Sequence, residues 1–340
     1  MKRERKNYEH FNDDLIALIR AEAPGLADDL CREMIYNVAQ VREEKFDIAE
    51  LRLLNTAFKE LRYALKVFKP YRNIPKAAVF GSARTPKDHS SFVFAENFGK
   101  ALVKKGWMII TGGASGIMEA AMVGAGAENS FGLNIMLPFE QNANPVILGD
   151  EKLIFFKYFF TRKLMFLKES ASTVLFPGGW GTFDEGFESM TLVQTGKARP
   201  RPIVMIDPPH SRYWRSLLDV MKENLEGGKL ISPGDLSLVT HCQDVDKAVE
   251  ELTRFYSNYD SSRFLRDLYL IRVRRPVTAD LLAVLNRDFR DILIQGDYEV
   301  LKDILEDDNH DPALHRIVFH FDKTGYARLH QLINTLNNAY

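Results

Sequence analysis

The sequence is poor in cysteine and in long hydrophobic runs, and each shortage excludes a class of protein. Only two cysteines, Cys31 and Cys242, occur among 340 residues, and they form no Cys-x-x-Cys pair. Widely spaced single thiols favour a reduced, cytoplasmic compartment over a disulfide scaffold, and neither thiol resembles a nucleophile. The most apolar runs, such as 153–156, are far too short to cross a bilayer, so no membrane partner is expected. The basic N-terminus leads into polar residues, without the apolar segment of a signal peptide.

The sequence also lacks an excess of either positive or negative charge. The formal net charge is −1, which provides no general attraction to nucleic acid or to anionic membranes. The basic residues within 2–6 are therefore interpreted as a solvated end in preference to a nucleic-acid arm. Three histidines, His310, His315 and His320, lie five residues apart, a spacing that suits no metal motif. Neither a metal nor a cofactor is expected.

Residues 1–70 are predicted to be helical. The clearest helix spans 47–68, where apolar residues recur at helical spacing from Leu51 to Phe68. Asp47 and Glu50 stand three residues apart at its start and predict a capping box. The apolar stripe is expected to pack against the main domain or a neighbouring subunit.

From Lys76 onward, apolar strands alternate with amphipathic helices. This alternation predicts a mostly parallel sheet with helices on both faces, the Rossmann-like doubly wound class of α/β fold. The predicted strands are 77–80, 107–110, 133–136, 173–176, 202–206 and 236–239. The predicted helices are 90–105, 116–127, 158–170, 182–195, 213–225 and 245–256, and 139–152 is expected to be a loop.

The C-terminal part is expected to be a small α/β addition. Its predicted strands are 269–273 and 317–321, and its predicted helices are 281–293 and 326–336. This unit would either complete the sheet or cover a subunit contact. The predicted domains are therefore a helical extension at 1–70, a Rossmann-like domain at 71–260 and the addition at 261–340.

A glycine-rich turn joins the strand at 173–176 to the helix that follows it. Residues 176–185 read Phe-Pro-Gly-Gly-Trp-Gly-Thr-Phe-Asp-Glu. Gly178, Gly179 and Gly181 permit a close approach to the backbone. The helix N-terminus offers unpaired N–H groups and a partial positive charge, which suit a phosphate.

The same turn has a purely structural interpretation. Thr182 and Glu185 have the spacing of a capping box, in which each side chain bonds the other's backbone N–H. A plain cap needs no glycines, however, and the acidic residues that follow would repel a phosphate. A ligand that fits both features places a phosphate on the glycines and offers hydroxyl groups to a carboxylate, as a sugar phosphate does.

Two further turns follow strands at the same expected edge of the sheet. Residues 111–119 carry Gly112, Gly113 and Gly116, but they lack the Gly-Lys-Ser/Thr of a Walker A loop and match G-x-G-x-x-G imperfectly. Alone this turn is weak evidence for a nucleotide, and no acidic residue after a second strand favours NAD. Residues 81–84, Gly-Ser-Ala-Arg, either hold a base or phosphate or leave the arginine in solvent.

Arg162 and Lys163 stand among aromatic residues of the predicted helix 158–170. An arginine on an apolar helix is usually an edge residue whose charge reaches water. Its permanently charged fork can equally bind two oxygen atoms of a ligand. Adjacent helical residues point in different directions, so only one of the two needs to face a site.

Residues 177–185 resemble the PGGxGTxxE signature of the LOG (Lonely Guy) family of nucleoside 5′-monophosphate phosphoribohydrolases. Thr-Arg-Lys-Leu-Met at 161–165 is similar to the Arg-Lys-x-x-Met element that accompanies that signature. The resemblance covers about residues 45 to 340, most strongly 75 to 200. Within the family, the sequence is most similar to the longer bacterial members, which have an N-terminal helical extension. The two motifs together are specific, whereas neither is alone.

The resemblance implies roles for individual residues. It makes Arg162 and Glu185 catalytic and requires no metal. It implies that a larger set, in the three turns and beside Arg162, binds the substrate: Gly81, Ser82, Gly112, Gly113, Gly116, Met118, Glu119, Lys163, Gly178, Gly179, Gly181 and Thr182. Residues 137–142 also resemble the family, and Gln141, Asn142 and nearby Asn144 either contact the base or form turns.

Two functions of different classes are compatible with these residues. The first is hydrolysis of the N-glycosidic bond of a nucleoside 5′-monophosphate, AMP-like or cytokinin-type, by a homodimer or larger homo-oligomer. The second is a non-catalytic nucleotide-binding sensor or carrier on the same fold. The presence of both Arg162 and Glu185 favours the enzyme. The lysine decarboxylase label that such proteins have also carried is not adopted, because no lysine with a cofactor-phosphate pocket is identifiable.

Overall fold

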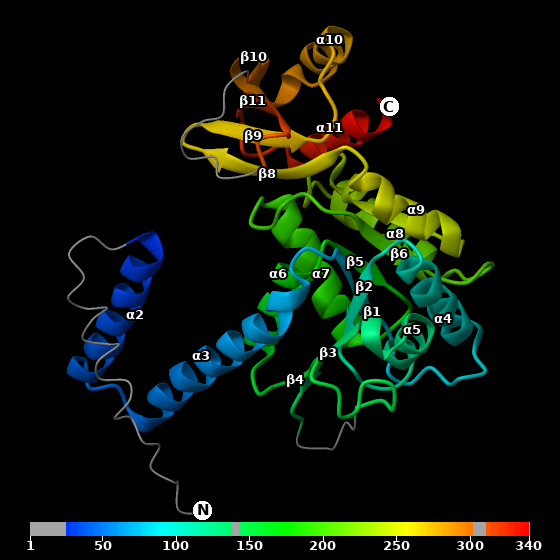
Figure 1. Ribbon diagram of the computed structural model, residues 1–340. Helices are drawn as coiled ribbons and strands as arrows, with labels where there is room; N and C mark the ends of the chain where they lie inside the picture. The colour runs from blue at the N-terminus through cyan, green and yellow to red at the C-terminus, as the bar shows by residue number, and fades with distance from the viewer. Residues whose placement is uncertain (1–24, 138–142, 302–310, 340) are drawn as a thin grey trace, which may run out of the picture. The chain divides into compact units, whose positions relative to one another are not determined.

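The computed structural model describes residues 25–137, 143–301 and 311–339 (Figure 1). The chain divides into two compact units, Met1–Lys59 and Glu60–Tyr340. The three-part division at 70 and 260 stays a prediction, as does the cytoplasmic location. Among the described helices, none is both long and apolar enough to cross a membrane.

The first unit contains helix α2 (Leu26–Glu43) and the start of helix α3 (Ile48–Phe68). The predicted capping box is confirmed, since the Asp47 N–H donates to Glu50 Oε2 and the Glu50 N–H donates to Asp47 Oδ1, both at 2.8 Å. The apolar stripe of α3 is only partly buried. Phe68 lies in a hydrophobic core, whereas Leu51 and Phe58 are exposed.

The second unit is built on a seven-stranded sheet in which every neighbouring pair is parallel. The strand order is β4-β3-β2-β1-β5-β6-β7. The strands are β1 (Lys76–Phe80), β2 (Met108–Thr111), β3 (Ser130–Ile135), β4 (Leu153–Phe156), β5 (Ser172–Leu175), β6 (Ile203–Ile206) and β7 (Val239–Cys242). This order confirms the Rossmann-like, doubly wound class.

Helices cover both faces of this sheet (Figure 1). One core holds α4 (Ser90–Val103), α5 (Ile117–Ala125) and α9 (Val245–Phe255), and the other holds α6 (Phe159–Glu169), α7 (Trp180–Gln194) and α8 (Tyr213–Met221). Successive residues of β1 point to opposite cores: Ala77 and Val79 to the first, Ala78 and Phe80 to the second. Burial on both faces explains why the strands are continuously apolar.

The chain reverses its direction of winding between β1 and β5. From β1 it proceeds outward through β2, β3 and β4, and it then returns so that β5 pairs directly with β1. The carboxyl ends of two such strands diverge into separate turns, and the crevice between them is where open α/β sheets bind ligands. The glycine-rich turns after β1 and β5 therefore stand at the expected binding edge.

Two predictions about the parallel sheet are wrong in detail. Strand β4 was not predicted, because Leu153–Phe156 is a four-residue apolar segment whose length does not separate a strand from a loop. The last strand begins at Val239 in place of Leu236. Residues Asp235–Leu238 form a 3₁₀ turn after Gly234, whose φ of 92° is in the left-handed region.

The C-terminal part forms its own antiparallel sheet in the order β10-β11-β9-β8. Its elements are β8 (Tyr259–Leu265), β9 (Leu268–Val273), α10 (Ala279–Asp288), β10 (Leu293–Leu301), β11 (His315–Phe321) and α11 (Tyr326–Asn338). It does not extend the parallel sheet, so that alternative is wrong. Strand β8 was missed because four of its seven residues are polar or charged, and β10 because Gln, Gly and Asp interrupt its apolar residues.

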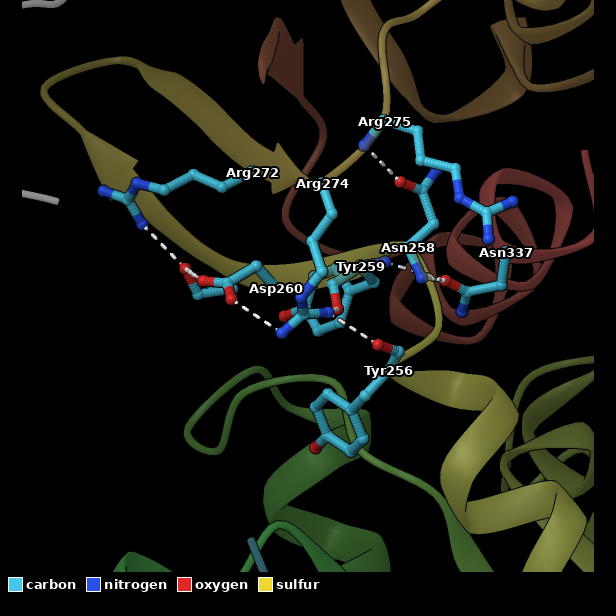
Figure 2. Close-up of polar contacts among 9 residues, drawn as sticks. Tyr256, Asn258, Tyr259, Asp260, Arg272, Arg274, Arg275 and Asn337 are labelled. Carbon is cyan, nitrogen blue, oxygen red and sulfur yellow. Dashed lines mark hydrogen bonds and ion pairs between the residues drawn. The ribbon is translucent and has the colours of Figure 1, made fainter. Parts of the chain in front are cut away.

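The antiparallel sheet is fastened to α11 at the point where β8 begins. The Asn337 side-chain oxygen accepts the N–H groups of Asn258 and Tyr259 at 3.2 and 2.8 Å (Figure 2). The Asn258 amide in turn donates to the Leu336 carbonyl at 2.9 Å and accepts the Arg275 N–H at 2.9 Å. These buried bonds satisfy backbone groups that the change from helix to strand leaves unpaired.

Candidate functional site

Three turns meet at the carboxyl ends of β1, β2 and β5. The Ser82 N–H donates to the Pro177 carbonyl at 3.1 Å, and the Ser82 carbonyl accepts the Ile117 N–H at 3.0 Å. Ser115 Oγ donates to the Ala83 carbonyl at 2.8 Å. The turns that the sequence singled out at 81–84, 111–119 and 176–185 therefore lie side by side.

Glycine is required where these turns touch. A Cβ on Gly116, whose φ is +69°, would lie 2.2 Å from the Ser82 carbonyl oxygen. A Cβ on Gly178 would lie 2.1 Å from Thr182 Oγ1 and 2.9 Å from the Ser82 nitrogen. No side chain fits at such distances, so the glycines permit the close approach of the turns.

Gly179 caps helix α7 and leaves N–H groups free at its start. The Thr182 and Phe183 N–H groups donate to the Gly179 carbonyl, whereas those of Trp180 and Gly181 have no acceptor in the part of the chain that the structure describes. A Cβ on Gly179 or Gly181 would meet no atom within 4 Å, so the space before them is open. The capping-box interpretation is wrong, because the helix begins before Thr182 and has no side-chain cap.

Arg162 and Glu185 meet across the interface of α6 and α7. Their closest atoms, Arg162 Nη2 and Glu185 Oε1, are 3.3 Å apart, and the side chains are only 14% and 6% exposed. Arg162 Cζ lies 5.0 Å from the ring centroid of Phe159 and 5.7 Å from that of Phe166. Arg162 Nε is buried and has no hydrogen-bond partner among the described residues.

Burial works against both charges of this pair. It raises the pKa of the Glu185 carboxyl to about 7, although Arg162 and Lys163 pull it down. Burial likewise lowers the pKa of the Arg162 guanidinium, although Glu185 pulls it up. Both shifts favour the neutral forms, so the mutual attraction does not fully offset the loss of water. Strongly shifted groups in a crevice are typical of functional sites.

Lys163 points away from this pair toward two other carboxylates. Its Nζ lies 2.8 Å from Asp184 Oδ1 and 2.8 Å from Glu188 Oε2. These ion pairs join α6 to α7 and leave Arg162 to face Glu185. A substrate contact by Lys163 stays a prediction.

The turn after β2 has the compact shape that its glycines allow. A Cβ on Gly112 would lie 2.8 Å from Met118 Sδ, and the Gly113 N–H donates to the Thr111 hydroxyl at 2.9 Å. Glu119 is buried, and its Oε1 lies 2.7 Å from Lys87 Nζ. The turn is in place beside the switch point, but the structure does not test its contact with a ligand.

Some predicted polar residues lie outside the described residues, namely Gln141, Asn142 and His310. Asn144 is described and forms a turn, since its Nδ2 donates to the Ala114 carbonyl at 3.0 Å and its Oδ1 accepts the Val146 N–H at 3.1 Å. Within the described residues, no three His, Cys, Asp or Glu side chains are grouped so as to hold a metal ion.

Comparison with known proteins shows which proteins the parallel-sheet domain resembles. Residues 116–252 match the family model described as "Possible lysine decarboxylase", which covers the LOG proteins. Over 130 residues the chain is 28% identical to the cytokinin riboside 5′-monophosphate phosphoribohydrolase of Mycobacterium tuberculosis, a match that covers 37% of this chain and 67% of that protein. Residues 116–252 of the parallel-sheet domain are thus similar to LOG proteins.

Solved structures are similar to about half of this chain. The molybdenum cofactor binding protein of Rippkaea orientalis is 18% identical with a TM-score of 0.37, over 52% of this chain and 94% of that one. The Moco carrier protein of Chlamydomonas reinhardtii is 22% identical with a TM-score of 0.36, over 54% of this chain and 97% of that one. At these identities the likeness concerns the fold alone.

Two residues that support the LOG motifs have no signal in the sequence. The Tyr213 hydroxyl, from α8, donates to the Gly178 carbonyl and so holds the signature turn from a distance of 35 residues. The Glu60 carboxylate accepts the Lys157 N–H at 2.7 Å and the Thr161 hydroxyl at 2.6 Å. Glu60 therefore fixes the start of α6 immediately before Arg162, although neither residue belongs to a recognisable motif.

The shifted pKa of Glu185 predicts how stability depends on pH. The folded chain holds this proton up to about pH 7, whereas the ordinary pKa is 4.5. The resulting stability is fully present below pH 4.5 and is lost as the pH rises through 7. Glu185→Gln has no such proton and should not lose this stability. When the pH is raised from 5 to 8, the free energy of unfolding of the wild type should therefore fall by about 1–3 kcal/mol more than that of the variant. Urea unfolding at both pH values measures this difference.

Glu188→Gln is the matched control, because Glu188 lies one turn further along α7 and is more exposed. Its stability relative to the wild type should change little over the same pH range. Equal pH dependence of the wild type and Glu185→Gln would contradict the raised pKa.

Proposed function

We propose that the chain hydrolyses the N-glycosidic bond of a nucleoside 5′-monophosphate, releasing the free base and ribose 5-phosphate. The observation that carries the proposal is the buried Arg162–Glu185 pair beside a helix N-terminus at the switch point of the sheet. The name of the Mycobacterium tuberculosis relative supports the same reaction class. Whether the base is adenine-like or of cytokinin type is left to a substrate panel.

The start of α7 is suited to the 5′-phosphate. The free N–H groups of Trp180 and Gly181 and the positive end of the helix dipole favour a doubly charged anion. The open space before Gly179 and Gly181 allows phosphate oxygens to reach the backbone. Thr182, buried behind them, completes this wall of the proposed phosphate site.

Glu185 would act on the sugar. Breaking the bond between C1′ and the base nitrogen builds positive charge on the ribose, and an adjacent carboxylate stabilises that charge. The same carboxylate can take a proton from the attacking water, whose oxygen forms the new bond to C1′. The bonding electrons and a proton leave with the base. A carboxyl with a pKa of about 7 is matched to proton transfer near neutral pH.

Arg162 would hold the substrate against Glu185. Its Nη2 is engaged by Glu185, whereas its Nε–H is buried and without an acceptor among the described residues. A buried donor without an acceptor is costly, and a substrate oxygen or base nitrogen would remove that cost. The decarboxylase name is not followed, since Lys163 of the Arg-Lys-x-x-Met element is held by Asp184 and Glu188.

The proposal includes a homo-oligomer. Trp180 is 89% exposed, and Phe159 and Phe160 are about half exposed at the start of α6. Aromatic residues exposed together are typical of protein interfaces. Their position beside Arg162 and the signature turn supports an interface close to the proposed site.

The 5′-phosphate is expected to be required for turnover. AMP and adenosine differ only in the group that the α7 N-terminus is proposed to hold. Base release from AMP should exceed that from adenosine by roughly 10²-fold or more, the size expected from losing several charge-assisted hydrogen bonds. The measurement is chromatographic quantification of free base at equal substrate concentrations, extended to other nucleoside monophosphates. Similar rates of base release from AMP and adenosine would contradict phosphate binding at the start of α7.

Glu185→Gln should lower turnover by roughly 10²-fold or more, because the variant keeps the shape but loses the charge, an electrostatic effect of about 3 kcal/mol. Arg162→Ala should show a comparable loss. Glu188→Gln, on the same helix, should remain within a few-fold of the wild type. A folded Glu185→Gln protein with normal base release would falsify the enzyme and favour the nucleotide-binding sensor or carrier.

The pH dependence of kcat/KM distinguishes whether Glu185 acts as a general base or as a general acid. If the Glu185 carboxylate is the active form, kcat/KM should rise about tenfold per pH unit below 7 and level off above it. Glu188→Gln should keep this profile. A profile that falls with rising pH would instead assign Glu185 the role of a proton donor.

A further inference from the structure

A cavity of about 950 Å³ lies at the amino end of the parallel sheet. Its wall includes Lys76 at the start of β1, and Trp107, Ala171 and Arg201 just before β2, β5 and β6. The LOG motifs stand at the opposite, carboxyl ends of the same strands. The cavity is therefore a different place from the proposed catalytic site, and that function does not account for it.

Positive charge is concentrated in this cavity. Seven basic side chains line it against two acidic ones, which leaves a surplus of five formal positive charges. The whole chain, by contrast, has a net charge of −1. The surplus is therefore a property of this location and not of the composition.

Both acidic residues of the cavity are already paired. Glu169 Oε1 lies 2.5 Å from Lys168 Nζ. Asp260 Oδ1 lies 2.8 Å from Arg274 Nη2, and Arg274 also donates to the carbonyl of Tyr256 (Figure 2). The other five basic residues form no ion pair with any described carboxylate: Arg72, Lys76, Lys197, Arg199 and Arg201.

Two of these five cations are deeply buried. Arg201 is 4% exposed and donates to the Leu167 carbonyl at 2.8 Å and the Ser170 hydroxyl at 2.5 Å, but its buried Nε has no partner among the described residues. Lys76 is 2% exposed and donates only to the carbonyls of Tyr71 and Ile74. Burial lowers the pKa of Lys76, and it lowers the pKa of Arg201 to about 10. Buried cations that face only neutral acceptors are costly, and an anion in the cavity would compensate them.

We propose that this cavity binds a compact anion with several phosphate groups, a di- or triphosphate, either free or attached to a nucleoside. Five cations without an ion pair to any described carboxylate suit the several negative charges of such a group, and arginine forks bind phosphate oxygens in pairs. The volume lies within the range of small-ligand sites.

The bound anion is placed to regulate the catalytic site through α6. Leu164, Leu167 and Lys168 line the cavity from this helix, and Arg201 binds its last turn. The same helix carries Arg162, whose guanidinium meets Glu185. A shift of α6 on anion binding would move Arg162 relative to Glu185. This regulation depends on the proposed function, whereas the binding itself does not.

The test is isothermal titration calorimetry of the full chain with inorganic tripolyphosphate, and in parallel with ATP. We expect saturable binding of one anion per chain. The double variant Lys197→Ala/Arg199→Ala removes two exposed cavity cations and should weaken binding at least tenfold. The matched control Lys100→Ala/Lys222→Ala removes two exposed cations from helical segments outside the cavity and should stay within about twofold.

Further outcomes of these titrations decide the proposal. Binding should persist in Glu185→Gln and in saturating AMP, whereas competitive displacement by AMP would overturn a separate site. No saturable binding, or equal weakening in the control variant, would also overturn it. Equal affinity for tripolyphosphate and ATP would identify the phosphate chain as the recognised group, whereas tighter binding of ATP would identify a nucleotide. Absence of AMP hydrolysis would defeat the proposed function and leave these titrations unaffected.

Discussion

The close approach of the β1 and β5 turns is the constraint on which the site depends. Because β5 returns beside β1, the Ser82 N–H can reach the Pro177 carbonyl, and the signature turn lies against the turn after β1. Gly178 and Gly116 allow this contact, since a Cβ on either would lie within 2.3 Å of a neighbouring atom. The start of α7 and the position of Glu185 follow from where this contact places the turn.

The buried Arg162–Glu185 pair is stabilised less well than the contacts that surround it. Arg162 and Glu185 lose hydration on burial, and the pKa of each is shifted toward its neutral form. Around them stand contacts that stabilise without such a conflict, among them the ion pairs of Lys163 and the hydrogen bonds of Glu60. The unfavourable burial of these two charges is therefore maintained by the stabilising contacts around them.

The fold class could be predicted from the sequence because buried parallel strands are continuously apolar and their helices are amphipathic. The same signal fails for short, polar or exposed strands: β4 has four residues, four of the seven residues of β8 are polar or charged, and five of the nine residues of β10 are exposed. Arg162 and Glu185 were both singled out because two motifs resemble those of the LOG family, but their contact with each other was not predicted. Tyr213 and Glu60 were missed because their partners are 35 and about 100 residues away, and no local pattern encodes such contacts.

The exposure of Trp180 gives the protein a built-in optical reporter. Of its three tryptophans, Trp107 and Trp214 are buried, whereas Trp180 is 89% exposed at the first position of α7. Emission from the two buried indoles is shielded from solvent, so the red-shifted and readily quenched part of the fluorescence originates from Trp180. Its backbone N–H is one of the free donors at the helix N-terminus. Occupation of that end of the helix therefore changes the environment of the one tryptophan that is exposed to water.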